Sequence, residues 1–437
     1  MSQLKLGRQV YQRAAIELGG YVFAQLLRLG SNLLLTRLLF PEAFGLAALV
    51  SIFVLGLSML SDAGFEQSIV QNIKGETPEF LNTAWTMGII RGFVLYAIAC
   101  VCAGPMAAIY GEPILAQLIP FAAFSLVLGG FDATSLFIAR RRLDVLPLIR
   151  IDLTSQVTAL VVVLAWVSYH PTIWALVFSG LIASLIRMVS SHFLIYGVRN
   201  RLTIDIDAAW EIFHFGKWIF GSTALTFLSM QADRLLIGGF IGPSTLGIYS
   251  IAVFIGEAAR NAVAKINSGI LFPVLSSVAR DARSSLGATF YNARLKTDLL
   301  GLFPIGALTV LAPFVIQILY DERYHAAGWM LQLLCIKVAM SIIIETIQSC
   351  LFSMGETKQG FIQNIIRSTT LAIGIPIGWL TGGLEGLIVA VALSEVPVIF
   401  YVWFVFARTK LLRFEREVLS FAIYGAGLGC GLMFELW

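Results

Sequence analysis

Charged residues are scarce in this sequence. Only 13% of its 437 residues are charged, whereas 58% are hydrophobic, and the mean hydropathy is +0.84. Soluble domains carry about 25% charged residues, so the composition excludes a soluble globular protein and indicates a polytopic integral membrane protein. The net charge of +4 is modest and its lysines and arginines are dispersed, so we expect no nucleic-acid partner.

Residues that serve common soluble chemistries are also few. The five cysteines (Cys100, Cys102, Cys335, Cys350, Cys430) all lie in apolar runs, which predicts small core residues and not disulfides or metal ligands. The four histidines are scattered, and no phosphate-binding loop or Ser/His/Asp arrangement is present. We therefore expect no catalytic residue, no metal site and no organic cofactor, and a protein that is not an enzyme.

Long hydrophobic runs are what the chain has in abundance. A helix needs roughly 20 apolar residues to cross a bilayer, and such runs predict an all-α protein. The predicted spans are 14–39, 42–62, 82–104, 114–138, 148–169, 171–197, 214–240, 244–272, 298–320, 326–352, 360–381, 384–407 and 417–436. Lysines and arginines concentrate in alternate loops, with Arg37 and Arg323 as the outside exceptions, which predicts a cytoplasmic N-terminus.

A weak repeat divides the predicted spans into halves. Pro41-Glu42-Ala43-Phe44-Gly45 follows the first span, and Pro243-Ser244-Thr245-Leu246-Gly247 follows the seventh, 202 positions later. Proline suits the first turn of a helix, and the glycine permits close packing. We predict twelve core spans in two six-helix lobes, 1–197 and 214–407, joined by a cytoplasmic amphipathic linker, 198–213. A basic loop and a thirteenth span follow at 408–437.

Polar side chains form stripes within several predicted spans. In the first span, four share one helical face: Glu17, Tyr21, Arg28 and Asn32. Two further stripes occupy the seventh and eighth spans: Ser222, Thr226, Ser229 and Asp233, then Tyr249, Glu257, Arg260, Asn261, Lys265 and Ser268. A guanidinium at bilayer depth is costly unless it faces protein or water. The stripes therefore predict a polar path enclosed by these helices.

Several motifs resemble those of one known family. They are Thr36-Arg37-Leu38-Leu39, Leu60-Ser61-Asp62-Ala63-Gly64-Phe65, Asp233-Arg234-Leu235-Leu236-Ile237 and Leu271-Phe272-Pro273-Val274-Leu275. Through them the chain resembles the polysaccharide transporter branch of the MOP exporter superfamily, the Wzx-type flippases. The resemblance implies transfer of a lipid-linked oligosaccharide, typically an undecaprenyl-diphosphate glycan, from the inner to the outer leaflet. Many members have fourteen spans, one more than predicted here.

A diphosphate headgroup calls for cations, and arginine supplies bidentate contacts to phosphate. The predicted headgroup residues are Arg28, Arg91, Arg260, Lys265 and Arg234. The predicted polar lining of the cavity is Glu17, Asn32, Ser222, Thr226, Ser229, Tyr249 and Asn261. Candidates for coupling to H⁺ or Na⁺ are Asp62, Asp233 and Glu257. For each charged residue the alternative is a structural ion pair, and Lys337 and Glu345, on one face of the tenth span, are expected to form such a pair within a lobe.

The leading interpretation is a polysaccharide biosynthesis transporter that works by alternating access through a cationic cavity between the lobes. It would act in a bacterial inner membrane, surrounded by lipids and with polysaccharide polymerase or assembly proteins as candidate partners. The alternatives are a small-molecule or drug cation antiporter of the same superfamily, a non-transporting scaffold of an assembly complex, and an integral-membrane glycosyltransferase, polymerase or ligase. The glycan, the coupling ion and the oligomeric state stay open.

Overall fold

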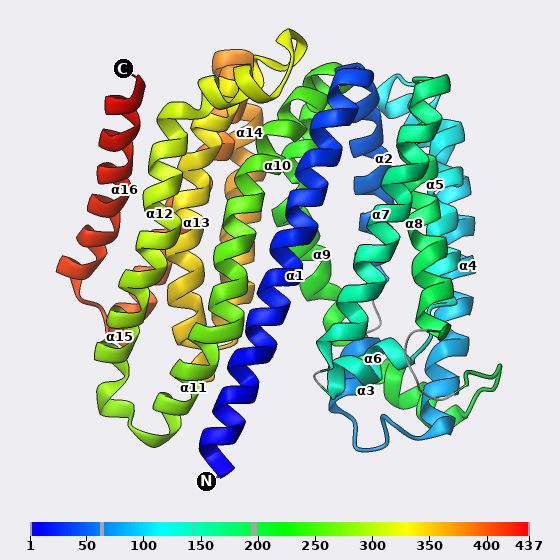
Figure 1. Ribbon diagram of the computed structural model, residues 1–437, viewed down its shortest axis with the longest axis horizontal. Coiled ribbons are helices and arrows are strands. Elements are labelled where there is room, and N and C mark those ends of the chain that lie inside the picture. Colours follow the sequence, from blue (N-terminus) through cyan, green and yellow to red (C-terminus); the bar gives the residue numbers. More distant parts are fainter. Residues whose placement is uncertain (1, 62–64, 143, 194–198, 436–437) are drawn as a thin grey trace. The chain divides into compact units, whose positions relative to one another are not determined.

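Backbone contacts divide the chain into two compact helical units. The computed structural model describes residues 2–61, 65–142, 144–193 and 199–435, and helix is the only regular secondary structure in those ranges (Figure 1). Unit 1 comprises Met1–Phe227 and Ile237–Gly247, and unit 2 comprises Leu228–Leu236 and Ile248–Trp437. The boundary falls inside two helices, so each of these helices contributes to both units.

Unit 1 begins with eight helices that are followed by most of a ninth. They are α1 (Ser2–Leu38), α2 (Pro41–Leu60), α3 (Phe65–Gln71), α4 (Pro78–Tyr110), α5 (Leu115–Gly130), α6 (Ser135–Arg141), α7 (Val145–Tyr169), α8 (Trp174–Phe193) and α9 (Ile206–Phe240). The second half of the chain continues with α10 (Pro243–Ile266), the π-helix Asn267–Leu271, α11 (Phe272–Asp281), α12 (Leu286–Leu319), α13 (Ala327–Ser353), α14 (Lys358–Ala392), α15 (Val396–Arg408) and α16 (Phe414–Glu435). Short 3₁₀ turns lie at Arg283–Ser285 and Glu322–Tyr324.

The all-α, polytopic membrane architecture predicted from the sequence is confirmed. Helix covers most of the described residues of every predicted span, and nine helices in the described ranges are long and apolar enough to cross a membrane, or ten if the bent pair α5 and α6 forms one span. The count of twelve core spans plus one stays a prediction. Two predicted spans are interrupted: 114–138 by the bend after Gly130, and 384–407 by the break between α14 and α15.

Local sequence explains where several helices begin and turn. Thr77 caps α4 by accepting a hydrogen bond from the Phe80 amide, and Pro78 follows at the first helical position. The Asp205 carboxylate caps α9 through the amide of Ala208, 2.8 Å away. Within α14, the backbone leaves helical geometry at Gly382 and Gly383, where φ reaches +57°, so the chain turns at the predicted boundary between spans 360–381 and 384–407.

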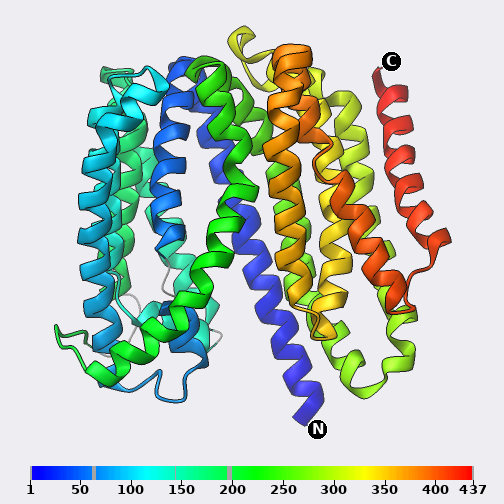
Figure 2. The ribbon, with the colours of Figure 1, turned by 180° about the vertical axis from the view of Figure 1, so that it is seen from behind.

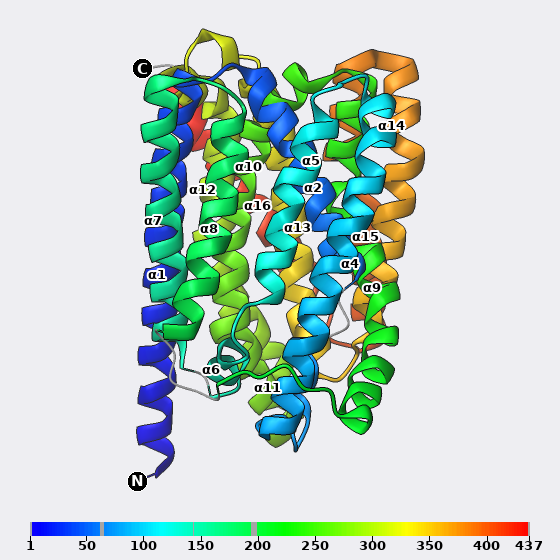
Figure 3. The same cartoon turned by 90° about the vertical axis from the view of Figure 1, so that its right-hand side faces the viewer.

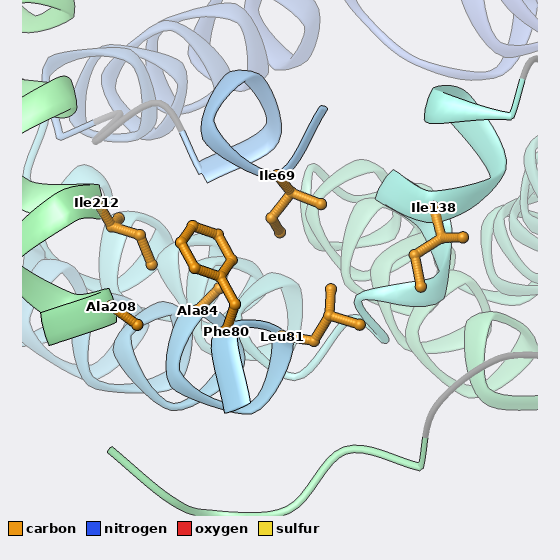
Figure 4. Packing of buried hydrophobic residues seen from close by; sticks show 7 residues of the cluster. All are labelled: Ile69, Phe80, Leu81, Ala84, Ile138, Ala208 and Ile212. Carbon is orange, nitrogen blue, oxygen red and sulfur yellow. The ribbon is translucent and has the colours of Figure 1, made fainter. Parts of the chain in front are cut away.

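A compact apolar cluster holds the short helices of unit 1 against α4. It consists of Ile69 from α3, Phe80, Leu81 and Ala84 from α4, Ile138 from α6, and Ala208 and Ile212 from α9 (Figure 4). Through these contacts α3, α6 and the beginning of α9 pack on the first turns of α4. The opposite face of α9 is exposed and carries Ile206, Trp210 and Phe213. This helix therefore begins inside the predicted linker 198–213 with a buried and an exposed apolar side.

The C-terminal helix is an integral part of unit 2. A Cβ on Gly306 of α12 would lie 2.2 Å from the carbonyl oxygen of Tyr424, and one on Gly427 of α16 would lie 2.2 Å from that of Phe303. Small residues allow such close approach of membrane helices. A buried charged group reinforces the contact, since Arg294 Nη1 lies 2.5 Å from the Glu417 carboxylate. The helix α16 (red in Figure 1 and Figure 2) is thus tied to α12.

The two Pro-x-x-x-Gly turns pack against each other within unit 1. The helices α2 and α10 begin at Pro41 and Pro243, as predicted. A Cβ on Gly45 would lie 1.7 Å from the carbonyl oxygen of Pro243, and one on Gly247 would lie 1.9 Å from that of Pro41. The contact is reciprocal, with each glycine facing the proline of the other turn. The predicted role of these glycines in close packing is confirmed.

Alanine at either glycine should therefore be poorly tolerated. In Gly45→Ala and Gly247→Ala the methyl group meets backbone that cannot rotate away, so the cost should be at or above the upper end of the ~1–3 kcal/mol typical of overpacking. We expect less monodisperse protein on purification and a lower midpoint of thermal unfolding. The matched control is Gly30→Ala, because a Cβ there meets nothing within 4 Å. Equal unfolding temperatures in all three variants would contradict the close contact.

Candidate functional site

A broken helix forms the most unusual feature of unit 1. The chain bends by 66° between α5 and α6, and residues 131–134 make the turn (Figure 3). Backbone groups freed by such a break need partners wherever lipid replaces water. The carbonyl of Phe131 contacts Trp85 Nε1 at 3.4 Å and His192 Nε2 at 2.9 Å. The Ala133 amide donates to Ser191 Oγ at 2.9 Å, so side chains of α4 and α8 stabilise the break.

An acidic residue at this break pairs with an arginine of α8. Arg187 Nε lies 3.1 Å from Asp132 Oδ2, and the Asp132 side chain is only 13% exposed. A cavity of about 320 Å³ adjoins the pair, and Arg91 and Arg140 also line it. Its other walls include Trp85, Leu126 and Phe137. Among the described residues, the lining therefore includes three guanidiniums and one carboxylate, all from unit 1.

Arg91 connects α4 to the last turn of α2. Its Nε donates to Ser61 Oγ at 3.0 Å and its Nη2 donates to the carbonyl of Ser58 at 2.6 Å. These bonds orient the guanidinium of a predicted headgroup residue at the cavity. Near the end of α6, Arg142 instead pairs with Glu76 at 2.7 Å, and its hydrogen bond holds the pKa of this exposed carboxyl below the ordinary value. Arg142 is not part of the cavity wall.

In unit 2, Asp233 is buried and fully engaged. Tyr249 Oη donates to Asp233 Oδ2 at 2.7 Å, the Arg234 amide donates to Oδ1 at 2.8 Å, and Lys337 Nζ lies 3.6 Å from Oδ2. The Arg234 side chain turns away and donates to Gln231 Oε1 at 3.2 Å. The expected pair of Lys337 with Glu345 was wrong, because the two side chains have different partners.

Glu345 belongs to a second charged group of unit 2. Arg260 lies between two glutamates, with Nη2 at 2.5 Å from Glu257 and Nη1 at 2.5 Å from Glu345. Asn261 accepts a longer hydrogen bond from the same guanidinium at 3.4 Å. With both glutamates ionised, the group carries a net charge of −1. The two carboxylates occupy the donors of this single guanidinium. Arg260 can therefore bind an anionic ligand only if one of these ion pairs opens.

A third group joins neighbouring helices at a break. Arg367 of α14 makes a bidentate pair with Glu395, with Nε at 2.7 Å from Oε1 and Nη2 at 2.9 Å from Oε2. Glu395 immediately precedes α15 and is buried. This fork geometry is strong and directional, so it fixes how α15 leaves α14.

The predicted site residues are divided between the units. Those in unit 1 are Glu17, Arg28, Asn32, Asp62, Arg91, Ser222 and Thr226. Those in unit 2 are Ser229, Asp233, Arg234, Tyr249, Glu257, Arg260, Asn261 and Lys265.

Asp62 and the side chains of Glu17 and Ser222 lie outside the described residues. The structure brings Asp233 to Tyr249, and Arg260 to Glu257 and Asn261. Arg28 and Lys265 are exposed, and Ser229 Oγ bonds Ser368 Oγ at 2.6 Å. Their functional roles stay predictions.

Besides Arg91, the cavity in unit 1 is lined by Asp132, Arg140 and Arg187. The sequence does contain a signal for the break, because Gly129 and Gly130 stand just before Asp132 inside a predicted span.

The cysteine prediction needs a correction: Cys335 and Cys350 are buried, but Cys100 and Cys430 are exposed, so an apolar run did not make them core residues. In the described part of the chain, no three His, Cys, Asp or Glu side chains are grouped to hold a metal ion.

The family model described as "Polysaccharide biosynthesis protein" matches residues 34–328, which is more than half of the chain. The chain belongs to this family. The succinoglycan biosynthesis transport protein ExoT of Rhizobium meliloti is 24% identical to it over 379 residues, which cover 85% of this chain and 75% of that protein.

Two solved structures show the fold. The lipid II flippase MurJ in an inward closed conformation has a TM-score of 0.78 at 15% identity, with 96% of this chain and 92% of that chain covered. An inward-facing multidrug resistance MATE family transporter of the MOP superfamily has a TM-score of 0.69 at 12% identity, covering 89% and 94%. The predicted polysaccharide biosynthesis family is confirmed by the family match, and the chain shares its fold with a solved transporter of the MOP superfamily.

The paired charges of unit 2 predict a specific double-mutant result. Arg260→Gln leaves Glu257 and Glu345 as neighbouring like charges, so it should destabilise the protein. Because these side chains are 17–34% exposed, we expect about 1–2 kcal/mol, below the ~3–5 kcal/mol of a fully buried pair. Adding Glu345→Gln should restore part of the thermal unfolding midpoint. Simple additivity of the two substitutions would show that the pair is not coupled.

Proposed function

We propose that this protein moves a polyprenyl-diphosphate-linked oligosaccharide from the inner to the outer leaflet of a bacterial inner membrane, with its N-terminus in the cytoplasm. The family match over residues 34–328 carries the proposal. Two similar proteins support it: ExoT is a succinoglycan biosynthesis transport protein, and MurJ, whose fold this chain shares, is a lipid II flippase. The particular glycan is not assigned.

The physical problem is the headgroup. Transfer of an ionised phosphate from water into hydrocarbon costs many kcal/mol unless the phosphate is paired or hydrated. The apolar prenyl tail, in contrast, is soluble in the lipid. A transporter therefore needs to shield the headgroup and glycan alone. In the proposed mechanism the headgroup enters a cationic cavity between two lobes, which then alternate access while the tail stays in the bilayer. Arg28, Arg91, Arg234, Arg260 and Lys265 are the proposed headgroup contacts.

Direction would come from the entry of H⁺ or Na⁺. With both glutamates ionised, Glu257, Arg260 and Glu345 carry a net charge of −1, and this supports the step because a bound cation neutralises the group. Each elementary charge that crosses the membrane potential contributes about 2.3 kcal/mol per 100 mV. Neutralising a glutamate also loosens its hold on Arg260 and frees guanidinium donors for a phosphate. Asp233 and Asp62 are the other proposed coupling residues.

The same negative group favours a second candidate, an antiporter of a small organic cation. A drug cation would bind where carboxylates outnumber guanidiniums, and unit 2 offers such a place. The arginine-rich cavity of unit 1 and the family match both favour the anionic lipid substrate. A scaffold that does not transport would need none of these intramembrane arginines, so their substitution separates the scaffold from a transporter of an anionic lipid. Polysaccharide polymerase and assembly proteins remain proposed partners.

Complementation of a strain that lacks this protein tests the proposal. We expect Arg28→Ala, Arg91→Ala and Arg260→Ala to abolish or strongly reduce surface polysaccharide and to accumulate lipid-linked precursor on the inner leaflet, because each removes a cation proposed to contact the diphosphate. Arg283→Ala, on an exposed 3₁₀ turn, is the matched control and should export normally. All variants are compared at equal membrane abundance. Normal export by all three test variants would reject headgroup capture and favour the scaffold.

A further inference from the structure

The segment that leads into α9 is fixed to the first turns of α4 by a ladder of hydrogen bonds. The amides of alternate residues donate to side-chain oxygens of α4: Arg201 to Asn82 Oδ1 at 2.9 Å, Thr203 to Thr86 Oγ1 at 3.2 Å, and Asp205 to Thr83 Oγ1 at 2.9 Å. The three acceptor residues are buried. The segment is therefore held in one place on the surface of unit 1.

The ladder lies where α4 passes from the headgroups into the acyl chains. The helix has 33 residues, so at ~1.5 Å per residue it is ~50 Å long, whereas the hydrocarbon core of a bilayer is ~30 Å thick. A centred helix thus extends roughly 10 Å beyond the hydrocarbon at each end. At the same rise, Asn82 and Thr86 lie roughly 6 and 12 Å beyond Pro78, the first residue of the helix. This end of α4 follows a loop that is predicted to be cytoplasmic.

The face of α4 that carries the ladder continues along the helix as an apolar stripe. Exposed aliphatic side chains follow Thr86 at helical spacings of three or four residues: Ile90, Val94, Ile98 and Val101. A stripe of this kind on a membrane-spanning helix is the side that contacts acyl chains. The ladder therefore covers the end of the lipid-facing side of α4.

The first turns of α9 have a buried and an exposed apolar face. Ala208 and Ile212 point toward Phe80 in the apolar cluster (Figure 4). Large apolar side chains on the other side of the segment and helix are 56–81% exposed: Leu202, Ile204, Ile206, Trp210 and Phe213. The rings of Trp210 and Phe213 stack on each other, with centroids 6.2 Å apart. An exposed apolar surface of this size marks contact with a protein or a membrane.

The acidic side of the same helix is directed to the predicted cytoplasmic loop before α4. Glu211 accepts a hydrogen bond from Asn72 Nδ2 at 2.8 Å and pairs with Lys74 Nζ at 3.2 Å. Asp207, one turn earlier on this side, is exposed. Polar and exposed apolar side chains are thus separated around the helix axis, as in helices that lie in a membrane interface.

We propose that residues 202–213 form an interfacial anchor, whose exposed apolar side chains insert into the bilayer surface at the predicted cytoplasmic end of α4. The partner is phospholipid, because the anchor adjoins the lipid-facing stripe of α4 at the depth where headgroups meet acyl chains. Tryptophan is enriched at this depth, which suits Trp210. Arg199 and Arg201 are exposed at the start of the segment, where their guanidiniums reach headgroup phosphates.

Photo-crosslinking of the purified full-length protein in liposomes tests the anchor. A diazirine amino acid replaces Ile206, Trp210 or Asp207, one at a time, and mass spectrometry measures the yield of phospholipid adducts after irradiation. We expect a several-fold higher yield at Ile206 and Trp210 than at Asp207. Asp207 is the matched control, because it is exposed on the same helix but on its acidic side. Equal yields at the three positions would overturn the proposal.

Two further measurements separate a lipid partner from a protein partner. In liposomes, Trp210→Phe keeps an aromatic ring and removes one fluorophore, so it should lose more of the quenching by lipids brominated near the headgroup than by lipids brominated near the chain end. Unchanged quenching by both lipids would contradict the anchor. In irradiated cell membranes, a protein adduct at Ile206 and Trp210 would assign this face to a protein and overturn the proposal. None of these assays requires transport, so their outcomes are independent of the proposed function.

Discussion

A charge or a free backbone group in a low-dielectric interior has to find its partner within the protein, and this constraint shapes both units. In unit 2 several buried or half-buried guanidiniums pair with carboxylates: Arg260 with two glutamates, Arg367 with Glu395, and Arg294 with Glu417. In unit 1 the same requirement is met by different means. There, hydroxyl, indole and imidazole groups satisfy the broken backbone.

The two units therefore arrange their charged side chains differently. Three arginines and one carboxylate are among the described residues that line the cavity of unit 1, whereas Arg260 contacts two glutamates in unit 2. Each cluster is internal to one unit. The pairing also explains why intramembrane arginine can be structurally necessary even where it never meets a substrate.

Much of the fold could be predicted from the sequence, because hydrophobic length and the Pro-x-x-x-Gly turns are local signals. The runs located the helices, and Gly45 and Gly247 were correctly assigned to close packing. The bend after Gly130 was missed, since hydropathy does not register a turn inside an apolar run. Ion-pair partners were also beyond reach: Lys337 and Glu345 share a helical face, yet each pairs with another helix, Lys337 with Asp233 and Glu345 with Arg260. Partner choice depends on interhelical geometry, which spacing along one helix does not contain.

The most direct test of the account is transbilayer movement itself. The protein would be reconstituted into liposomes with a polyprenyl-diphosphate oligosaccharide, and a membrane-impermeant reagent that modifies the glycan would report the fraction exposed outside over time. We predict that the inner-leaflet pool becomes accessible at a rate that depends on the protein and that falls sharply in Arg91→Ala. Accessibility that stays at the level of protein-free liposomes, under an imposed ion gradient and membrane potential, would contradict it.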